Sequence, residues 1–170
     1  MFILLINESF ISIILILISI VIHELGHIIT IYLFKVEIKS IDIEPFGCSI
    51  NIDELSGYKK DIIISLAGPL NGLLLSLSCA FLNFYFDSVY LFYLLFINLI
   101  YSAINLIPCR ELDGGKIIES ILYLKFDPIR SYKIIELINT ISSITLITLT
   151  LYYCIFTNFN FSLTSLCTVL

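Results

Sequence analysis

Four long apolar stretches divide the chain, and polar residues gather in the connections between them. They cover approximately residues 9–34, 62–86, 88–108 and 134–156, with few or no charged side chains inside each. A helix that crosses the hydrocarbon layer of a bilayer needs about 20 consecutive apolar residues. The pattern therefore predicts an all-α integral membrane protein, a polytopic bundle of about four to five transmembrane helices, with a partial span over 159–170 as the fifth.

Composition agrees with a membrane protein, and the charged residues orient it. Of 170 residues, 59% are hydrophobic and 14% are charged, whereas soluble domains are about half apolar and about a quarter charged. The net charge of −5 also lacks the basic footprint of a nucleic-acid-binding protein. All nine Lys and Arg residues fall between 35 and 60 or between 110 and 133, on one side of the predicted bundle. The positive-inside rule places that side in the cytoplasm.

The connection between the first two stretches has a different period. Isoleucine alternates with polar residues in Ser40–Glu44 and again in Ser49–Asp53, and Pro45-Phe46-Gly47 lies between the two segments. Alternation at every second residue is typical of strands, so we expect a small β-hairpin, or a loop that dips into the membrane, on the cytoplasmic side. An exposed edge strand can bind an extended substrate, which makes Ile50 a candidate substrate-binding residue. A simple cover over the helix ends is the alternative.

Residues 23–27 read His-Glu-Leu-Gly-His inside the first apolar stretch. Positions i and i+4 share one face of a helix, so His23 and His27 can bind one metal ion, and imidazole is a zinc ligand. Glu24 can then act as a general base toward water. An ionisable residue inside a span costs about 2.5 kcal/mol or more unless it is paired or functional. If the span instead ended near Ile22, the motif would be solvated and its spacing would have no explanation.

A catalytic zinc site takes three protein ligands and keeps one position open. The chain has only two histidines, so the third ligand must be a carboxylate or a thiolate, and Cys109, Glu111 and Asp113 lie near the cytoplasmic end of the third stretch. Gly114 and Gly115 allow a sharp turn that aims Asp113 back at the bundle. As the N-cap of a following helix, Asp113 would instead serve the backbone. Spacing alone leaves both roles open.

Small residues interrupt the second stretch. Gly68-Pro69 and Gly72 predict close packing of this helix against its neighbours. The alternative is a kink that opens a path for water or substrate. Polar residues inside the second and third stretches are few, chiefly Asn71, Asn98 and Asn105.

The two motif-bearing segments resemble the site-2 protease family of intramembrane zinc metalloproteases, peptidase family M50. That family has His-Glu-x-x-His in one transmembrane segment and Asn-x-x-Pro-x-x-x-Leu-Asp-Gly near the end of a later one, and this chain has them at 23–27 and 105–114. Three more stretches are similar to the stage IV sporulation protein FB branch: Glu44-Pro45-Phe46-Gly47, Ala67-Gly68-Pro69-Leu70 and Leu112-Asp113-Gly114-Gly115-Lys116. The resemblance covers residues 10–125, most of the chain.

The resemblance implies that His23, His27 and Asp113 bind one Zn²⁺ per chain, that Glu24 is the catalytic carboxylate and that Asn105 lies near the substrate backbone. It implies hydrolysis of a peptide bond in or near a membrane-associated segment of a protein substrate. The branch implies a sporulation sigma-factor precursor as that substrate and membrane inhibitor or regulatory proteins as partners. It also implies a multi-pass protein of the bacterial cell membrane or forespore membrane, with its active site toward the cytoplasm.

The chain also departs from the branch. Glu111 stands where the branch has a proline before Leu-Asp-Gly. We expect a single membrane-embedded metalloprotease domain over 1–170, with neither a cystathionine-β-synthase-type (CBS) domain nor a PDZ domain. Two other classes stay open: a catalytically inactive membrane scaffold, and a metal-binding membrane protein without protease activity.

Overall fold

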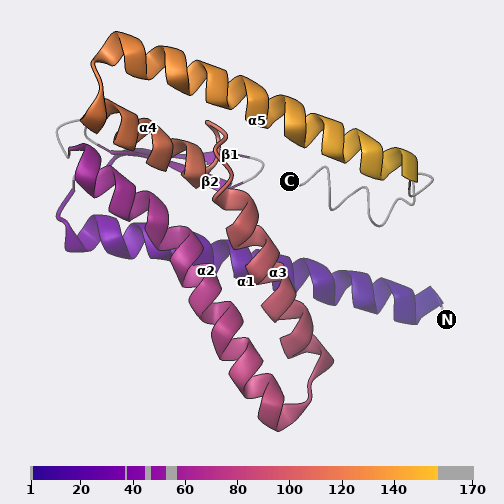
Figure 1. Ribbon diagram of the computed structural model, residues 1–170. Coiled ribbons are helices and arrows are strands. Elements are labelled where there is room, and N and C mark those ends of the chain that lie inside the picture. Colours follow the sequence, from indigo (N-terminus) through magenta and orange to yellow (C-terminus); the bar gives the residue numbers. More distant parts are fainter. Residues whose placement is uncertain (1, 37, 45–46, 53–56, 157–170) are drawn as a thin grey trace.

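The computed structural model describes residues 2–36, 38–44, 47–52 and 57–156, and this part of the chain forms five helices and a two-stranded sheet (Figure 1). In chain order the elements are α1 (Phe2–Leu33), β1 (Ile38–Glu44), β2 (Gly47–Ile52), α2 (Tyr58–Phe86), α3 (Val89–Asn105), α4 (Asp113–Lys125) and α5 (Pro128–Phe156). The partial span expected over 159–170 lies outside the described residues.

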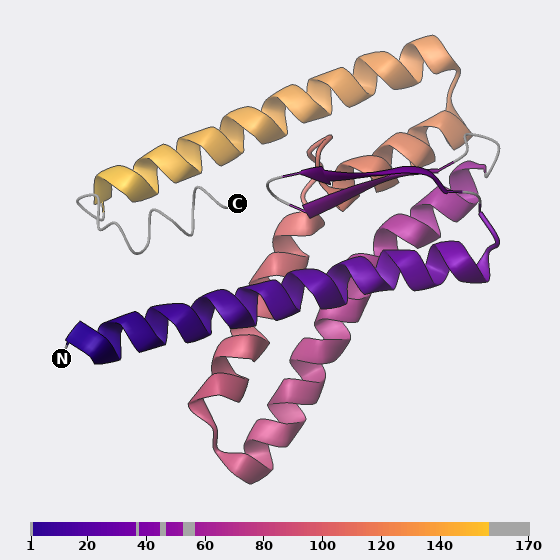
Figure 2. The same ribbon diagram turned by 180° about the vertical axis from the view of Figure 1, so that it is seen from behind.

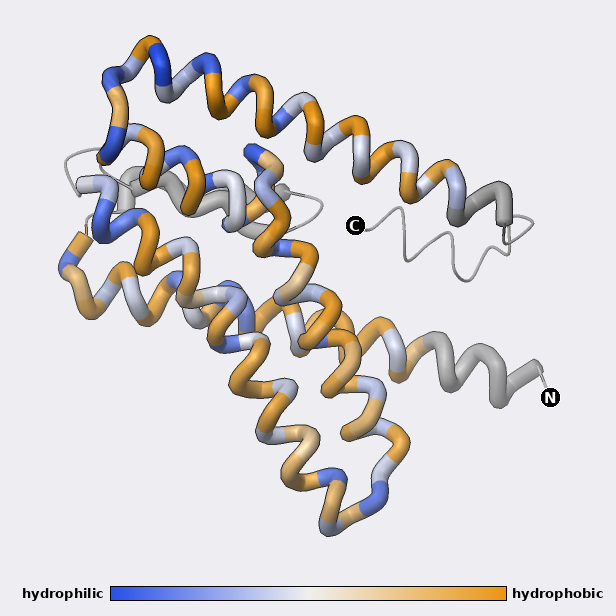
Figure 3. Tube along the Cα trace, viewed as in Figure 1, coloured by the Kyte–Doolittle hydropathy of each residue, from blue (hydrophilic) through white to orange (hydrophobic). Residues whose placement is uncertain are grey.

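Three helices of the described chain are long and apolar enough to cross a membrane: Phe10–Leu33 in α1, α2, and Pro128–Tyr152 in α5. Their apolar runs are visible along the tube in Figure 3. The third expected span, 88–108, is corrected to α3, which has 17 residues and ends at Asn105. At 1.5 Å per residue α3 is about 25 Å long, shorter than the hydrocarbon layer of about 30 Å. Pro108 explains the early end, because a proline disfavours helical backbone in the residue before it.

Helices α2 and α3 form an antiparallel pair, and α1 crosses both of them (Figures 1 and 2). The crossings are close because small residues line them. A Cβ atom added at Gly26 would lie 2.5 Å from the Ala67 carbonyl oxygen, and one added at Gly72 would collide with Ser102 Oγ. Since α2 continues through Pro69 from Tyr58 to Phe86, the packing interpretation of its glycines is confirmed at Gly72.

The bundle is polar inside and apolar outside, as suits a protein solvated by lipid. Among the described residues the buried apolar side chains are Leu15, Ile31, Ile64 and Cys79, whereas eleven polar or charged residues are buried. Interhelical hydrogen bonds join them: Ser76 Oγ donates to the Leu95 carbonyl at 3.1 Å and Asn98 Nδ2 donates to Ser19 Oγ at 3.0 Å. Because lipid supplies no hydrophobic drive between helices, such polar contacts and close packing hold transmembrane helices together.

The sheet lies between α1 and α2 in the sequence, and it lies beside α1 in the fold (Figure 2). Strands β1 and β2 pair antiparallel, with Ile41 opposite Ile50 and Glu44 opposite Gly47, and the register shifts between Ile38 and Ser40. The two residues that join the strands lie outside the described residues.

Helix α5 begins at Pro128, six residues before the start that hydropathy predicted. Proline is favoured in the first helical position because its missing N–H would have no intrahelical partner there. Asp127 Oδ2 accepts a hydrogen bond from the Arg130 N–H at 3.2 Å, which caps the helix. Ser131 Oγ donates to the Leu122 carbonyl at 2.9 Å and fastens α5 to α4. The apolar window of α5 is 0% buried within the described protein, so lipid or another partner must cover it.

Candidate metal centre

Three side chains that could hold a metal ion meet where α1 contacts the start of α4. Asp113 Oδ2 lies 3.0 Å from His23 Nε2 and 3.2 Å from His27 Nε2, and the two Nε2 atoms are 3.2 Å apart. The side chains are almost removed from solvent, with relative exposures of 2% for His23, 8% for His27 and 6% for Asp113. They are the only group of three or more His, Cys, Asp or Glu residues in the described chain that could hold a metal ion.

The turn between α3 and α4 brings Asp113 to the histidines. Leu112 is the N-cap residue, and Asp113 is the first residue of α4 and makes no side-chain cap, so the alternative role as N-cap is wrong. Gly114 and Gly115 are needed because a Cβ atom at either would collide with backbone carbonyls of the turn, Leu106 and Cys109 respectively. Glycine at both positions therefore lets the first turn of α4 pack against the end of α3, which places Asp113 over α1.

A hydrogen bond fixes the tautomer and the orientation of the His27 ring. His27 Nδ1 lies 2.8 Å from the Ile64 carbonyl oxygen of α2, which can only accept, so Nδ1 carries the proton and Nε2 offers its lone pair. Metal-binding histidines are commonly oriented in this way. His23 has no corresponding protein partner within the described chain for its Nδ1. Its ring instead meets the Tyr101 ring edge-on, with the centroids 4.9 Å apart.

The carboxylates differ in their surroundings. Asp113 is buried, and its Oδ2 atom lies close to the Nε2 atoms of both His23 and His27. Its second oxygen, Oδ1, lies 4.0 Å from Lys116 Nζ. Glu24 is adjacent to His23 in α1, and its buried Oε2 atom has no hydrogen-bond partner among the described protein atoms. Asp113 therefore contacts both imidazoles, whereas Glu24 has one carboxylate oxygen without a hydrogen-bond partner among the described protein atoms.

The three donors fit a zinc ion. Zinc lies 2.0–2.2 Å from nitrogen and oxygen ligands, so tetrahedral ligands are about 3.3–3.6 Å from one another. The observed triangle, with sides of 3.0–3.2 Å, is slightly smaller and needs only a small expansion to hold one ion. Two imidazoles and one carboxylate leave a fourth position open, as in catalytic zinc sites.

Gly68 of α2 is also a site residue, whereas the sequence predicted for it only close helix packing or, as the alternative, a kink. A Cβ atom at Gly68 would collide with His27 Nε2 and lie 2.7 Å from His23 Nε2. Glycine therefore keeps the space beside both donor nitrogens free. The signal in the sequence was a glycine in the middle of an apolar stretch, but that signal does not say which neighbour the glycine faces.

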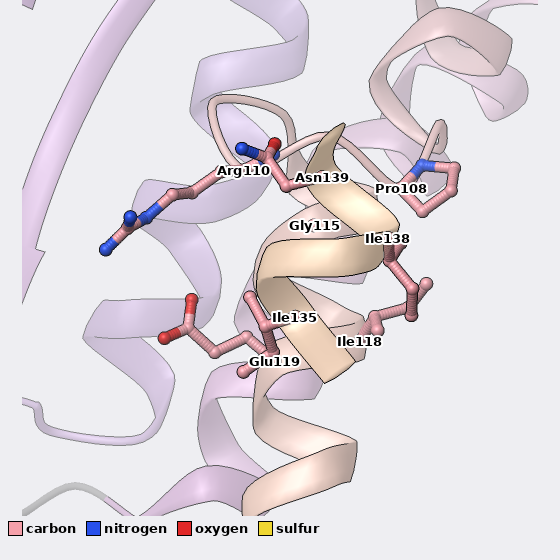
Figure 4. A pocket seen from close by; sticks show the side chains of 8 residues that line it. All are labelled: Pro108, Arg110, Gly115, Ile118, Glu119, Ile135, Ile138 and Asn139. Atoms are coloured by element: carbon pink, nitrogen blue, oxygen red, sulfur yellow. The ribbon is translucent and has the colours of Figure 1, made fainter. Parts of the chain in front are cut away.

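The other candidate ligands lie elsewhere. Cys109 Sγ is 3.7 Å from Asn139 Oδ1 and 3.7 Å from Ser143 Oγ, both on α5, and Glu111 is exposed. A shallow pocket occupies this region between the turn, α4 and α5 (Figure 4), and its lining residues are Pro108, Arg110, Gly115, Ile118, Glu119, Ile135, Ile138 and Asn139. This pocket contains none of the three donors.

Of the two candidate substrate-binding residues, Asn105 lies near the metal centre and Ile50 lies in the sheet. Asn105 is the last residue of α3 and is buried, and its Nδ2 donates to the Tyr101 carbonyl at 3.0 Å. Asn105 thus lies one helical turn from Tyr101, whose ring contacts His23 of the metal centre. Ile50 lies in β2 opposite Ile41.

The chain is similar to curated proteins that include a zinc metalloprotease. It is 32% identical over 126 residues to a zinc metalloprotease of Methanocaldococcus jannaschii, covering 71% of this chain and 37% of that protein. It is 29% identical over 110 residues to stage IV sporulation protein FB of Bacillus subtilis, covering 60% of this chain and 37% of that protein. The chain thus spans little more than a third of the length of these relatives.

A solved structure and a family model extend the likeness. The site-2 protease from Methanocaldococcus jannaschii superposes with a TM-score of 0.68 at 26% sequence identity, over 94% of this chain and 73% of that one. The model for Peptidase family M50 matches residues 11–89 and 86–149, which include all three donors. The chain therefore belongs to peptidase family M50, the membrane-embedded site-2 protease family.

Proposed function

We propose that this protein is an intramembrane zinc metalloprotease that hydrolyses a peptide bond in or near a membrane-associated segment of a protein substrate. The observation that carries the proposal is the buried triangle of His23 Nε2, His27 Nε2 and Asp113 Oδ2, with the free oxygen of Glu24 next to it in the sequence. Ionisable groups inside a membrane protein are costly unless they are paired or functional, and here a buried aspartate meets the His-Glu-Leu-Gly-His motif of an apolar helix.

Each residue has a separate task. His23, His27 and Asp113 would hold one Zn²⁺ per chain, and bound zinc supplies Lewis acidity that makes water reactive near neutral pH. Glu24 accepts a proton from the attacking water at its carboxylate and returns it to the nitrogen of the leaving amine. Burial of the donor set keeps bulk water away, which strengthens the electrostatic interactions within the site.

Substrate has to reach this centre as an extended chain, since a helix hides its carbonyl groups in its own hydrogen bonds. We assign the extended binding to an edge of the sheet, where main-chain hydrogen bonds can add a substrate strand, and Ile50 is the candidate contact on β2. Asn105 is the candidate contact at the end of α3, because it is one turn from Tyr101, which touches His23. All nine basic residues lie on one side of the predicted bundle. This supports a site in a bacterial cell membrane or forespore membrane that opens toward the cytoplasm.

The substrate class follows from similarity rather than from the site. The likeness to stage IV sporulation protein FB supports a role in sporulation. On that basis we propose a membrane-associated sigma-factor precursor as the substrate and membrane proteins as inhibitory or regulatory partners.

The test is co-expression of the protein with candidate membrane-tethered precursors, with cleavage followed by immunoblot. Glu24→Gln and Asp113→Asn are expected to abolish cleavage, and Glu136→Gln, on exposed α5, is the matched carboxylate control. If Glu24→Gln processes the precursor like wild type, the hydrolase assignment fails and the inactive-scaffold alternative stands. If purified wild-type protein contains no zinc after growth in zinc-supplemented medium, the metal assignment fails.

A further inference from the structure

Besides Glu24 Oε2, three further buried polar atoms have no hydrogen-bond partner among the described protein atoms: His23 Nδ1, Asn98 Oδ1 and Ser102 Oγ. His23 is 2% exposed, and Asn98 and Ser102 are 0% exposed. Buried polar groups in folded proteins are nearly always hydrogen-bonded, to protein or to ordered water. Three such atoms in one short stretch of the α1–α3 contact therefore need a shared explanation.

Contacts between α1 and α3 place the three residues along one stretch of the interface between these helices. Asn98 of α3 bonds Ser19 of α1, and Tyr101 of α3 contacts His23 of α1. His23 is one turn beyond Ser19, and Ser102 is one turn beyond Asn98. Moving one turn along each helix from the first contact therefore brings Ser102 level with His23.

Helix α2 gives the same register independently. Gly72 faces Ser102 Oγ, and Gly68, one turn away, faces the Nε2 atoms of both histidines. The hydroxyl of Ser102 therefore lies about one turn of α2, roughly 5.4 Å along the helix axis, from the Nε2 atoms of the two histidines. Ser102 Oγ and His23 Nδ1 make no direct hydrogen bond, so a bridging molecule is needed to join them.

The three groups have the donor and acceptor character that one water molecule satisfies. Asn98 Nδ2 donates to the Leu94 carbonyl at 2.8 Å, which can only accept, so Oδ1 is the free atom and is an acceptor. His23 must carry its proton on Nδ1 if Nε2 is to face a metal, so Nδ1 is a donor. The Ser102 hydroxyl can do either. A buried water makes about three hydrogen bonds.

We propose that one structural water molecule joins His23 Nδ1, Ser102 Oγ and Asn98 Oδ1. Ser102 and Asn98 act through it as positioning residues for His23. The inference rests on the proposed zinc site and adds to it the outer support of the second ligand: the Ile64 carbonyl fixes His27 directly, and the water fixes His23. Loss of such outer contacts typically weakens metal affinity 10–100-fold.

The first experiment measures the zinc Kd of detergent-purified protein by competition with a chromophoric chelator. Ser102→Ala removes the hydroxyl, and Ser102→Cys retains its volume with a much weaker hydrogen-bonding group. Both are expected to bind zinc about tenfold or more weakly than wild type. Ser78→Ala is the control, since Ser78 is an exposed serine of α2 that bonds only its own helix. Circular dichroism and Tm establish that each variant folds.

The second experiment uses zinc-loaded protein labelled with ¹⁵N-histidine, which gives signals from only two rings. We expect a His23 Nδ1–H proton that cross-relaxes with water in wild type and Ser78→Ala, and that loses this cross-peak in both Ser102 variants. If Ser102→Cys keeps wild-type affinity while Ser102→Ala loses it, packing rather than hydrogen bonding is responsible and the inference is overturned. An unchanged Kd in both variants, or a missing water cross-peak in wild type, also overturns it. If wild type itself binds no zinc, the proposed function fails. The water bridge is then judged from the Tm of the metal-free protein, which should be lower in both Ser102 variants than in Ser78→Ala, and equal Tm values overturn it.

Discussion

Replacing Gly68 with alanine adds one methyl group beside the two donor nitrogens. The new Cβ would collide with His27 Nε2 and lie 2.7 Å from His23 Nε2, whereas carbon and nitrogen atoms in contact are separated by about 3.5 Å. Relieving the collision requires α2 to move away from α1 or the imidazoles to rotate, by about 1 Å. A site displaced by this much no longer holds its ligands, because functional geometry tolerates only about 0.5 Å.

Gly68→Ala has two opposing effects on the free energy of unfolding. We therefore expect it to weaken zinc binding much more than it lowers stability. Overpacking costs about 1–3 kcal/mol, while alanine is favoured over glycine inside a helix by about 0.5–1 kcal/mol. We expect the net destabilisation to be about 2 kcal/mol or less. Zinc affinity, in contrast, should fall about 100-fold or more. Both histidines are displaced, and disturbing the contacts that hold one ligand in place typically weakens metal binding about tenfold or more.

The assay pairs zinc competition with thermal unfolding of the same samples. Ala80→Ser, which adds one heavy atom on the exposed side of the same helix, should match wild type in both. Should Gly68→Ala bind zinc as tightly as wild type, the open space beside the donor atoms has no role in metal binding and the geometric reasoning is refuted.

Three further outcomes are expected. Asp113→Asn should lower zinc affinity at least about tenfold, and a variant with wild-type zinc content would remove Asp113 from the ligand set. Ile50→Pro removes one main-chain N–H from β2 and should reduce substrate turnover without loss of zinc; turnover equal to wild type in folded protein would eliminate the sheet-edge binding mode. Asn139→Ala removes the side-chain oxygen that accepts a hydrogen bond from the Arg110 N–H at 2.9 Å. It should lower the free energy of unfolding by about 1 kcal/mol, measured by thermal or denaturant unfolding. An unchanged value would show that this contact between α5 and the turn does not contribute to stability.

Local periodicity determined most of the secondary structure. Long apolar runs marked α1, α2 and α5, and the alternating isoleucines fall where β1 and β2 pair. The boundaries were less accurate, because hydropathy records how apolar a residue is and not whether its backbone is helical. Pro108 follows apolar residues that have already left α3, and Pro128 opens α5 among polar residues that hydropathy excluded.

Within the site, the sequence by itself determined that His23 and His27 share one face of a helix, since a spacing of four residues is a property of any helix. It could not decide between a cap and a ligand role for Asp113, which is 90 residues from His23, or identify the neighbours of Gly68. Those depend on how closely α1, α2 and α4 approach, which is set by packing of small residues at the crossings. Only the tertiary structure therefore brings the third donor to the other two and sends Cys109 toward α5 instead.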